Sequence, residues 1–176
     1  MNLYRNTLAT ALFVLILAGC NASTSPTGQT TTPGSMVAKV TINGNAEAWS
    51  STVLPGISGG AKAYQKGNIL TVTGISATDN TQITIELYNP AIGSDSLGTT
   101  GDNAFYSHVI GVADTTVYAS IPTFSLTNPS AGAVTITAYD TTAKTISGSF
   151  HFVGKLATNL SDSVTVTGGS FDQVGW

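Results

Sequence analysis

The sequence predicts an all-β fold, an antiparallel β-sandwich of about nine to ten short strands, with a closed or flattened β-barrel as the alternative. Two observations carry this prediction. Apolar and polar residues alternate in short runs, which is the period of strands with one face in a core and one in water. The chain also contains 19 Gly and many Thr, which disfavour helices. Period two does not distinguish a sandwich from a barrel, so both remain open.

The predicted strands follow one another at short intervals. The clearest alternating runs lie at 70–73, 83–88, 134–139, 145–152 and 164–167. Turn-forming residues separate the runs, at Lys66-Gly67-Asn68, Asp79-Asn80, Asn89-Pro90 and Asn128-Pro129. A further turn is predicted at Asp140-Thr141-Thr142, because an Asp side chain accepts hydrogen bonds from nearby backbone N–H groups. Connections this short join antiparallel neighbours.

The charge of the chain excludes one class of partner. The 176 residues, about one domain's worth, include six Lys and Arg in total and carry a formal net charge of −3. So few basic residues do not neutralise a phosphate backbone. We therefore expect no nucleic-acid partner.

Residues 1–19 are predicted to be a lipoprotein signal peptide. Arg5 supplies positive charge before an apolar stretch from Leu8 to Ala18. This stretch is too short to span a bilayer, which takes about 20 residues. Position, charge and length together are typical of a secretory signal.

The signal ends in Leu17-Ala18-Gly19-Cys20, which resembles the bacterial lipobox. The resemblance implies that the signal peptidase recognises Leu17, Ala18 and Gly19. It also implies that Cys20 becomes the first mature residue and is the site of lipid attachment. Because Cys20 is the only cysteine, lipidation would leave no thiol for a disulfide, a metal site or a nucleophile.

A lipobox anchor supplies two or three acyl chains, and stable attachment takes more than one. We therefore expect a lipid-anchored protein of the cell envelope, with the membrane as its permanent partner. Position 21 is Asn, where an inner-membrane retention signal has Asp, and no acidic run follows Cys20. Both features favour the outer membrane in a Gram-negative host.

Residues 20–35 are predicted to comprise the lipidated Cys20 and a flexible tether. The segment 21–35 carries no charge and is mostly Ser and Thr, with Pro and Gly between them. Such a segment buries too little apolar surface to offset the entropy cost of ordering it. The alternative is that part of it adds an edge strand to the domain. Residues 36–176 are predicted to form a single β domain, large enough to fold without disulfides.

Three motifs suggest a family. They are Ile42-Asn43-Gly44 followed by Trp49, then Ile146-Ser147-Gly148-Ser149-Phe150-His151-Phe152, and finally Val164-Thr165-Val166-Thr167-Gly168-Gly169-Ser170-Phe171. With the lipobox and polar tether, they resemble a bacterial lipoprotein family known only as a domain of unknown function, with a late "isGtFsF" strand and a closing "vtiTnGsF". Gly168 and the irregular segment 90–106 depart from the family pattern. The resemblance implies no activity, substrate or cofactor.

No catalytic or metal site is predicted. The segment 56–60 matches the G-x-S-x-G pattern, but a nucleophile elbow needs a following helix, and 61–64 has the pattern of a strand. His108 and His151 lack metal-type spacing, and the acidic residues lie mostly at predicted turns. We expect the protein not to be an enzyme and to need no cofactor. An enzyme would need two carboxylates facing each other across a cleft.

One pattern concerns modification. Asp95-Ser96-Leu97 and Asp162-Ser163-Val164 resemble an O-glycosylation signal of some Gram-negative lipoproteins. Asp114-Thr115 and Asp140-Thr141 fit a looser version. Turn formation favours the same residue pairs, so both interpretations stay open.

Aromatic residues suggest a binding role. Tyr88 and Tyr139 fall on the polar sides of their predicted strands, and exposed rings can stack on sugars or on a protein partner. We therefore expect a non-catalytic binding module for a glycan or a protein, with a structural envelope component lacking a specific ligand as the alternative. A groove lined by two or more of Trp49, Tyr64, Tyr88 and Tyr139 would favour binding. Their dispersal or burial would favour the structural role.

Overall fold

The computed structural model describes residues 33–53, 60–98, 102–108, 116–120, 131–156 and 158–176. These residues form eleven strands and contain no α-helix. The strands are β1 (Ser35–Ile42), β2 (Asn45–Ser50), β3 (Ala61–Lys66), β4 (Ile69–Ser76), β5 (Thr81–Tyr88), β6 (Gly93–Leu97), β7 (Asn103–His108), β8 (Val117–Ala119), β9 (Gly132–Asp140), β10 (Thr145–Leu156) and β11 (Asn159–Gly175).

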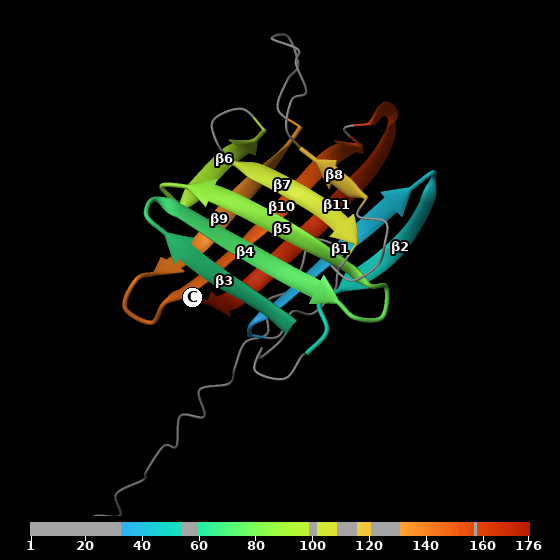
Figure 1. Ribbon diagram of the computed structural model, residues 1–176. Coiled ribbons are helices and arrows are strands. Elements are labelled where there is room, and N and C mark those ends of the chain that lie inside the picture. Colours follow the sequence, from blue (N-terminus) through green and yellow to red (C-terminus); the bar gives the residue numbers. More distant parts are fainter. Residues whose placement is uncertain (1–32, 54–59, 99–101, 109–115, 121–130, 157) are drawn as a thin grey trace, which may run out of the picture.

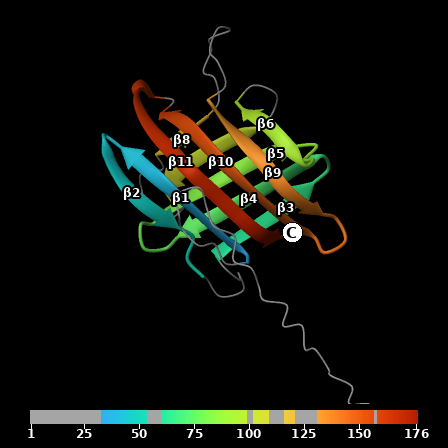
Figure 2. The same cartoon turned by 180° about the vertical axis from the view of Figure 1, so that it is seen from behind.

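All eleven strands belong to one antiparallel sheet that folds over on itself. Its main path is β2-β1-β11-β10-β8-β7-β5-β4-β3, and β9 and β6 branch from β10. Figure 1 shows β3, β4, β5 and β7 in front of β1, β10 and β11, whose strands cross them. Figure 2 shows the back layer, with β10 and β11 between β1 and β9.

This arrangement confirms the predicted all-β sandwich, with one strand more than the upper prediction. The hydrogen-bonded path ends at β2 and at β3, so the described strands are not closed into a barrel. The first strand begins at Ser35, one residue before the predicted domain boundary. The predicted signal peptide and nearly all of the tether, with Leu17, Ala18, Gly19 and Cys20, lie outside the described residues.

The core fills the space between the two layers. Most apolar positions of the alternating runs are buried, as predicted: Leu70 and Val72 on β4 and Ile83, Ile85 and Leu87 on β5 are at most 1% exposed. Ala138 of β9 is an exception and is exposed, because Thr137 is an extra residue in the pairing with β10 and shifts the alternation there. The back layer contributes a row of phenylalanines, with the ring centroid of Phe150 6.2 Å from that of Phe171. Apolar burial of this kind is the main stabilising contribution in a domain of this size.

Two glycines make room for this row of rings. A Cβ on Gly148 would lie 2.7 Å from Cζ of Phe171 and 2.6 Å from the carbonyl oxygen of Thr135. A Cβ on Gly169 would lie 2.4 Å from Cε2 of Phe150. Gly148 and Gly169, one from each late motif, therefore serve packing.

The turn between β9 and β10 is also as predicted. Oδ1 of Asp140 accepts hydrogen bonds from the backbone N–H groups of Thr142 and Ala143, each 2.8 Å long. The hydrogen bond from Ala143, and then that from Thr142, lowers the pKa of the Asp140 carboxyl, because both favour its charged form.

Asp102 links the end of β5 and the end of β6 to the start of β7. Its side chain accepts a hydrogen bond from the backbone N–H of Tyr88, and its carbonyl oxygen accepts one of 2.6 Å from the N–H of Gly98. The residue is only 4% exposed. Burial raises the pKa of the Asp102 carboxyl, the bond from Tyr88 opposes this shift, and the charge of Asp95 adds to it.

We expect Gly148→Ala to destabilise the fold by about 1–3 kcal/mol, because the added methyl group overlaps Phe171 and the backbone of Thr135. Chemical denaturation measures this loss. The matched control is Gly175→Ala, where the nearest atom to the new Cβ is 3.8 Å away. Equal stability of the two variants would contradict the packing role of Gly148.

We expect Asp102→Asn to raise the melting temperature at pH 7 and to change it less near pH 3. The raised pKa means that the folded state holds the Asp102 proton more tightly than the unfolded state. The stability from that proton is complete below the unfolded pKa and is lost as the pH rises through the folded pKa. Asn keeps the acceptor for Tyr88 and carries no charge.

The control for this experiment is Asp140→Asn, because the pKa of Asp140 is shifted in the opposite direction. The stability contributed by Asp140 is present above its unfolded pKa and is lost as the pH falls. Its replacement should therefore lower the melting temperature at pH 7. Melting temperatures followed from pH 3 to pH 7 that shift alike for both variants would refute the assignment of Asp102.

Candidate functional site

An open cavity of about 530 Å³ lies where the chain enters β1. Four segments line it: Pro33 and Gly34 at the start of β1, the start of β3, the turn between β9 and β10, and the end of β11. Backbone hydrogen bonds tie these segments together: Gly34 N–H donates to the carbonyl of Asp172 (2.7 Å) and Ala61 N–H to the carbonyl of Gly34 (2.9 Å). We call this space the Trp176 cavity, after its aromatic residue.

Trp176 is held in place from two directions. Its ring stacks on Tyr139 with centroids 5.2 Å apart and an interplanar angle of 19°. Its backbone N–H donates to the carbonyl of Lys144 over 3.1 Å. The pairing of Thr145 with Gly175 explains the position, because it sets the last residue of the chain beside the β9–β10 turn.

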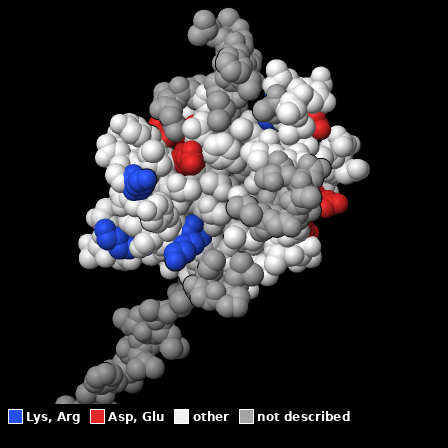
Figure 3. Space-filling model, viewed as in Figure 1, with Lys and Arg blue, Asp and Glu red and all other residues white. Residues whose placement is uncertain are grey.

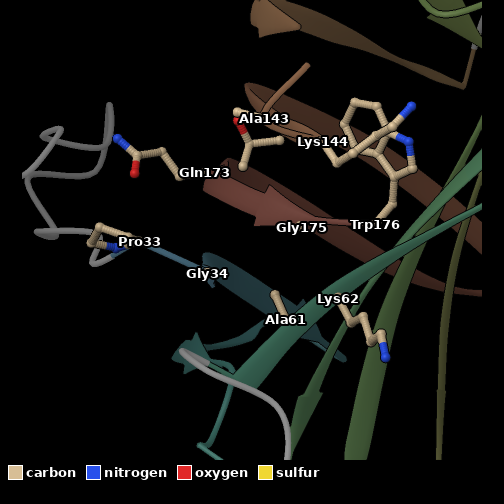
Figure 4. A pocket seen from close by; sticks show the side chains of 10 residues that line it. Pro33, Gly34, Ala61, Lys62, Ala143, Lys144, Gln173, Gly175 and Trp176 are labelled. Atoms are coloured by element: carbon tan, nitrogen blue, oxygen red, sulfur yellow. The ribbon is translucent and has the colours of Figure 1, made fainter. Parts of the chain in front are cut away.

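The indole of Trp176 has one unusual neighbour and one unsatisfied group. Nζ of Lys144 lies 5.7 Å from the ring centroid, within the range of a cation–π contact. Figure 4 shows the Lys144 side chain lying across the ring. The indole Nε1 is buried and has no hydrogen-bond partner among the described residues. Buried indole N–H groups usually find an acceptor, so this donor is unsatisfied.

The polar groups around the Trp176 cavity are mostly donors. Lys62 and Gln173 lie at its rim, away from the indole (Figure 4), and none of its described lining residues is Asp or Glu. Neither Lys62 nor Lys144 forms an ion pair among the described residues. Figure 3 shows basic side chains gathered over β3 and around the β9–β10 turn, with acidic ones above them and along the right edge of this view. The cavity is therefore a basic region on an acidic protein.

Backbone strain is concentrated at the same place. Five described residues other than glycine have positive φ, and three of them are asparagines, which tolerate this conformation. The other two are Lys144 (φ 57°) and Gln173 (φ 45°), and both line the Trp176 cavity. A left-handed conformation costs a residue with a Cβ about 1–2 kcal/mol, which glycine avoids.

The local sequence explains how both residues are held. Lys144 completes the turn that Asp140 caps. Gln173 lies in a bulge of β11, where two residues oppose Ser147 of β10. Its N–H donates to the Ser147 Oγ over 2.8 Å, and that hydroxyl donates to Oδ1 of Asp172 over 3.1 Å.

A second cavity, of about 240 Å³, is acidic. Glu47 and Asp79 line it together with Trp49 and Tyr106. Burial raises the pKa of Tyr106, the hydroxyl of Thr81 opposes the shift, and the charges of Asp79 and then Glu47 add to it. Oδ2 of Asp79 accepts a 2.7 Å hydrogen bond from Ser76, which caps the β4–β5 turn. The acidic pair thus shares a cavity, but one of its carboxyl groups is engaged in a turn.

A third cavity, of about 320 Å³, runs along the back layer beside His151 and Thr135 of β10 and β9. His151 is exposed there. His108 ends β7, and its side chain lies outside the described part of the structure. No cluster of three His, Cys, Asp or Glu that could hold a metal occurs among the described residues.

The four candidate aromatic residues do not form one groove. Trp49 is only 2% exposed, and its Nε1 donates to Oγ1 of Thr81 over 2.9 Å. Tyr139 was predicted on the polar side of its strand, but it is half-buried against Trp176. Tyr64 and Tyr88 are 66% and 50% exposed. Of the three cavities, none is lined by two of the four.

Tyr64 and Tyr88 share the outer face of the front layer. Ile69 of β4 is 45% exposed on the same face. It pairs with Tyr88 of β5 on one side and, on the other, with Lys66 of β3, the strand that carries Tyr64. Trp176 was missed as a candidate by the sequence analysis. Only the register of β10 on β11 identifies it, and that register is a long-range property.

The other sequence candidates are distributed as follows. The Asp-Ser pairs at 95–96 and 162–163 lie within β6 and β11 and not in turns, and Asp114 lies outside the described residues. Glu47, Glu86 and Asp172 are also in strands, so the prediction that acidic residues lie mostly at turns was wrong. Residues 56–59 of the G-x-S-x-G match are not described, and β3 follows directly at Ala61. The described residues include no helix long and apolar enough to cross a membrane.

Comparison with known proteins places the chain in a family. Neither a curated protein nor a solved structure matches it significantly. One family model does, over residues 55–175. The match includes both late motifs, with Gly148 and Gly169, and the residues of β3, β10 and β11 that line the Trp176 cavity. Because the model covers most of the chain, the protein belongs to the family described as a domain of unknown function, DUF6252.

Proposed function

We propose that this protein is a non-catalytic binding module of the cell envelope, held to the membrane by lipid on Cys20, and that it binds a carbohydrate in the Trp176 cavity. One observation carries the proposal. Trp176, stacked on Tyr139, lies in a cavity of about 530 Å³ with hydrogen-bond donors at its rim. That volume is within the range of small-molecule sites, about 300–1,000 Å³.

The chemistry of the lining favours a sugar. The C–H face of a sugar ring packs against an aromatic ring, and its hydroxyl groups accept hydrogen bonds from ammonium, amide and indole donors. The Trp176 cavity offers these donors in Lys62, Lys144 and Gln173. Its described lining residues include no His, Asp or Glu, the usual side chains for proton transfer, which supports a binding role over a catalytic one.

The anchor and the cavity are compatible. Pro33 and Gly34 line the cavity, so the predicted tether joins the domain at this rim. A flexible tether of this length has a root-mean-square reach of roughly 20 Å. Lipid on Cys20 would therefore hold the cavity close to the membrane surface and to the glycans attached there.

The structural alternative retains one supporting observation, the dispersal of Trp49, Tyr64, Tyr88 and Tyr139 over separate parts of the fold. A scaffold without a ligand needs no aromatic groove. The two functions differ in whether the protein binds any saccharide at all.

We expect Trp176→Ala to weaken saccharide binding at least about tenfold, which is the loss of one well-packed contact worth about 1.4 kcal/mol. A glycan array identifies the ligand, isothermal titration measures its affinity, and mass spectrometry shows that the ligand is recovered intact. The control is Tyr88→Ala, which removes an exposed ring far from this cavity. A wild-type protein that binds no glycan, or a Trp176 variant that binds as the wild type does, would refute the proposal.

We expect Cys20→Ser to move the protein from the membrane fraction to the aqueous fraction of its host and to abolish incorporation of labelled fatty acid. Serine has no thiol to accept the lipid. Ser23→Ala, a change in the same predicted tether, should alter neither result. A Cys20 variant that stays fully in the membrane fraction would contradict the lipid anchor.

A further inference from the structure

We propose that the ligand of the Trp176 cavity is an acidic saccharide, whose anionic group binds the ammonium group of Lys144 after Lys144 leaves the Trp176 ring, with Lys62 adding positive charge at the rim. The inference rests on the proposed function and adds the class of ligand. The anionic group is a sugar carboxylate or a sugar phosphate, since both accept charge-assisted hydrogen bonds from lysine.

The first support is electrostatic. Two lysines line the cavity, and none of its described lining residues is Asp or Glu, in a chain whose net charge is −3. Neither lysine forms an ion pair among the described residues, and the nearby Asp140 carboxylate is engaged with backbone N–H groups of its own turn. Two cations in a concave site attract an anion and repel a cationic ligand.

The second support is the backbone at Lys144 and Gln173. Both residues adopt left-handed conformations that glycine or asparagine would adopt at lower cost. Strain of this kind persists where a side chain is needed for function. Lys144 and Gln173 are the two described residues with positive φ that are neither glycine nor asparagine, and both line one cavity. This indicates that the site requires their side chains.

The third support is the contact between Lys144 and Trp176. Nζ of Lys144 lies 5.7 Å from the centroid of the Trp176 ring, so its ammonium group makes a cation–π contact and no ion pair with a described carboxylate. The indole Nε1 beside it is buried and has no acceptor. A ligand that draws Lys144 onto its own anionic group exposes the ring to the sugar face and gives the indole N–H an acceptor.

The test uses matched probes on the mature chain with Cys20→Ser. The probes are a glucuronate-containing disaccharide, the corresponding neutral disaccharide with glucose in its place, and glucose 6-phosphate. Titration calorimetry measures affinity at low and high salt. NMR follows the indole N–H signal of Trp176, which is assigned by its loss in Trp176→Phe.

We expect the wild type to bind an acidic probe at least tenfold more tightly than the neutral disaccharide, with the preference reduced at high salt and the indole N–H signal shifted. Lys144→Gly should lose that preference without a lower melting temperature, because glycine relieves the strain. Lys62→Gln should reduce the preference in part. The controls are Lys66→Gln, a lysine of β3 outside the cavity, and Asn80→Gly, a left-handed turn residue elsewhere; both should keep the preference.

The outcomes separate the two proposals. Equal affinity for the acidic and neutral probes, or a preference that survives Lys144→Gly, overturns the acidic ligand and leaves carbohydrate binding intact. Absence of binding to any probe and to a glycan array overturns both. Tighter binding of the glucuronate probe than of glucose 6-phosphate identifies a carboxylate as the anionic group, and the reverse order identifies a phosphate; both support the inference.

Discussion

The pairing of β10 with β11 is the constraint on which the rest of the structure depends. These are the two longest strands, with 12 and 17 residues, and they lie at the centre of the back layer. Their register places Phe150 opposite Gly169 and Phe171 opposite Gly148. Each phenylalanine ring therefore packs against the backbone of a glycine. The same register pairs Thr145 with Gly175 and so carries Trp176 to the β9–β10 turn. Core packing and the candidate site are therefore two consequences of one alignment.

The Trp176 cavity lies where several backbone segments are tied to one another. Gly34 donates to Asp172 and accepts from Ala61, so β1, β3 and β11 are fixed together at the point where the predicted tether begins. Binding groups held by strands and by hydrogen-bonded turns lose little conformational entropy when a ligand arrives. Lys144 is the exception, since its long side chain is exposed and lies over the ring of Trp176. It is the group best suited to move.

The local parts of this structure were accessible from the sequence, and the site was not. Alternation predicted the buried positions of β4 and β5, and Asp140 predicted its turn, because both depend on neighbours within a few residues. The burial of Trp49 could not be predicted, because β2 is an edge strand with little alternation and the contact of Trp49 with Thr81 joins distant strands. Trp176, Lys62 and Lys144 meet through long-range register, and the positive φ of Lys144 has no sequence signal, since glycine or asparagine is expected there.

The positive φ of residues that are neither glycine nor asparagine also bears on the choice between a binding and a structural role. A protein selected only for stability would gain from glycine at 144 and 173 and from an acceptor for the indole N–H, since each change removes a local cost. The fold instead keeps two strained side chains, an unpartnered donor and two lysines, all around one cavity. Elsewhere among the described residues, left-handed positions without glycine are held by asparagine, which fits them well. Asp162 and Ser170 also have buried oxygen atoms without a partner, but only the Trp176 cavity combines such an atom with strained side chains and lysines. This combination favours a binding role over a passive scaffold.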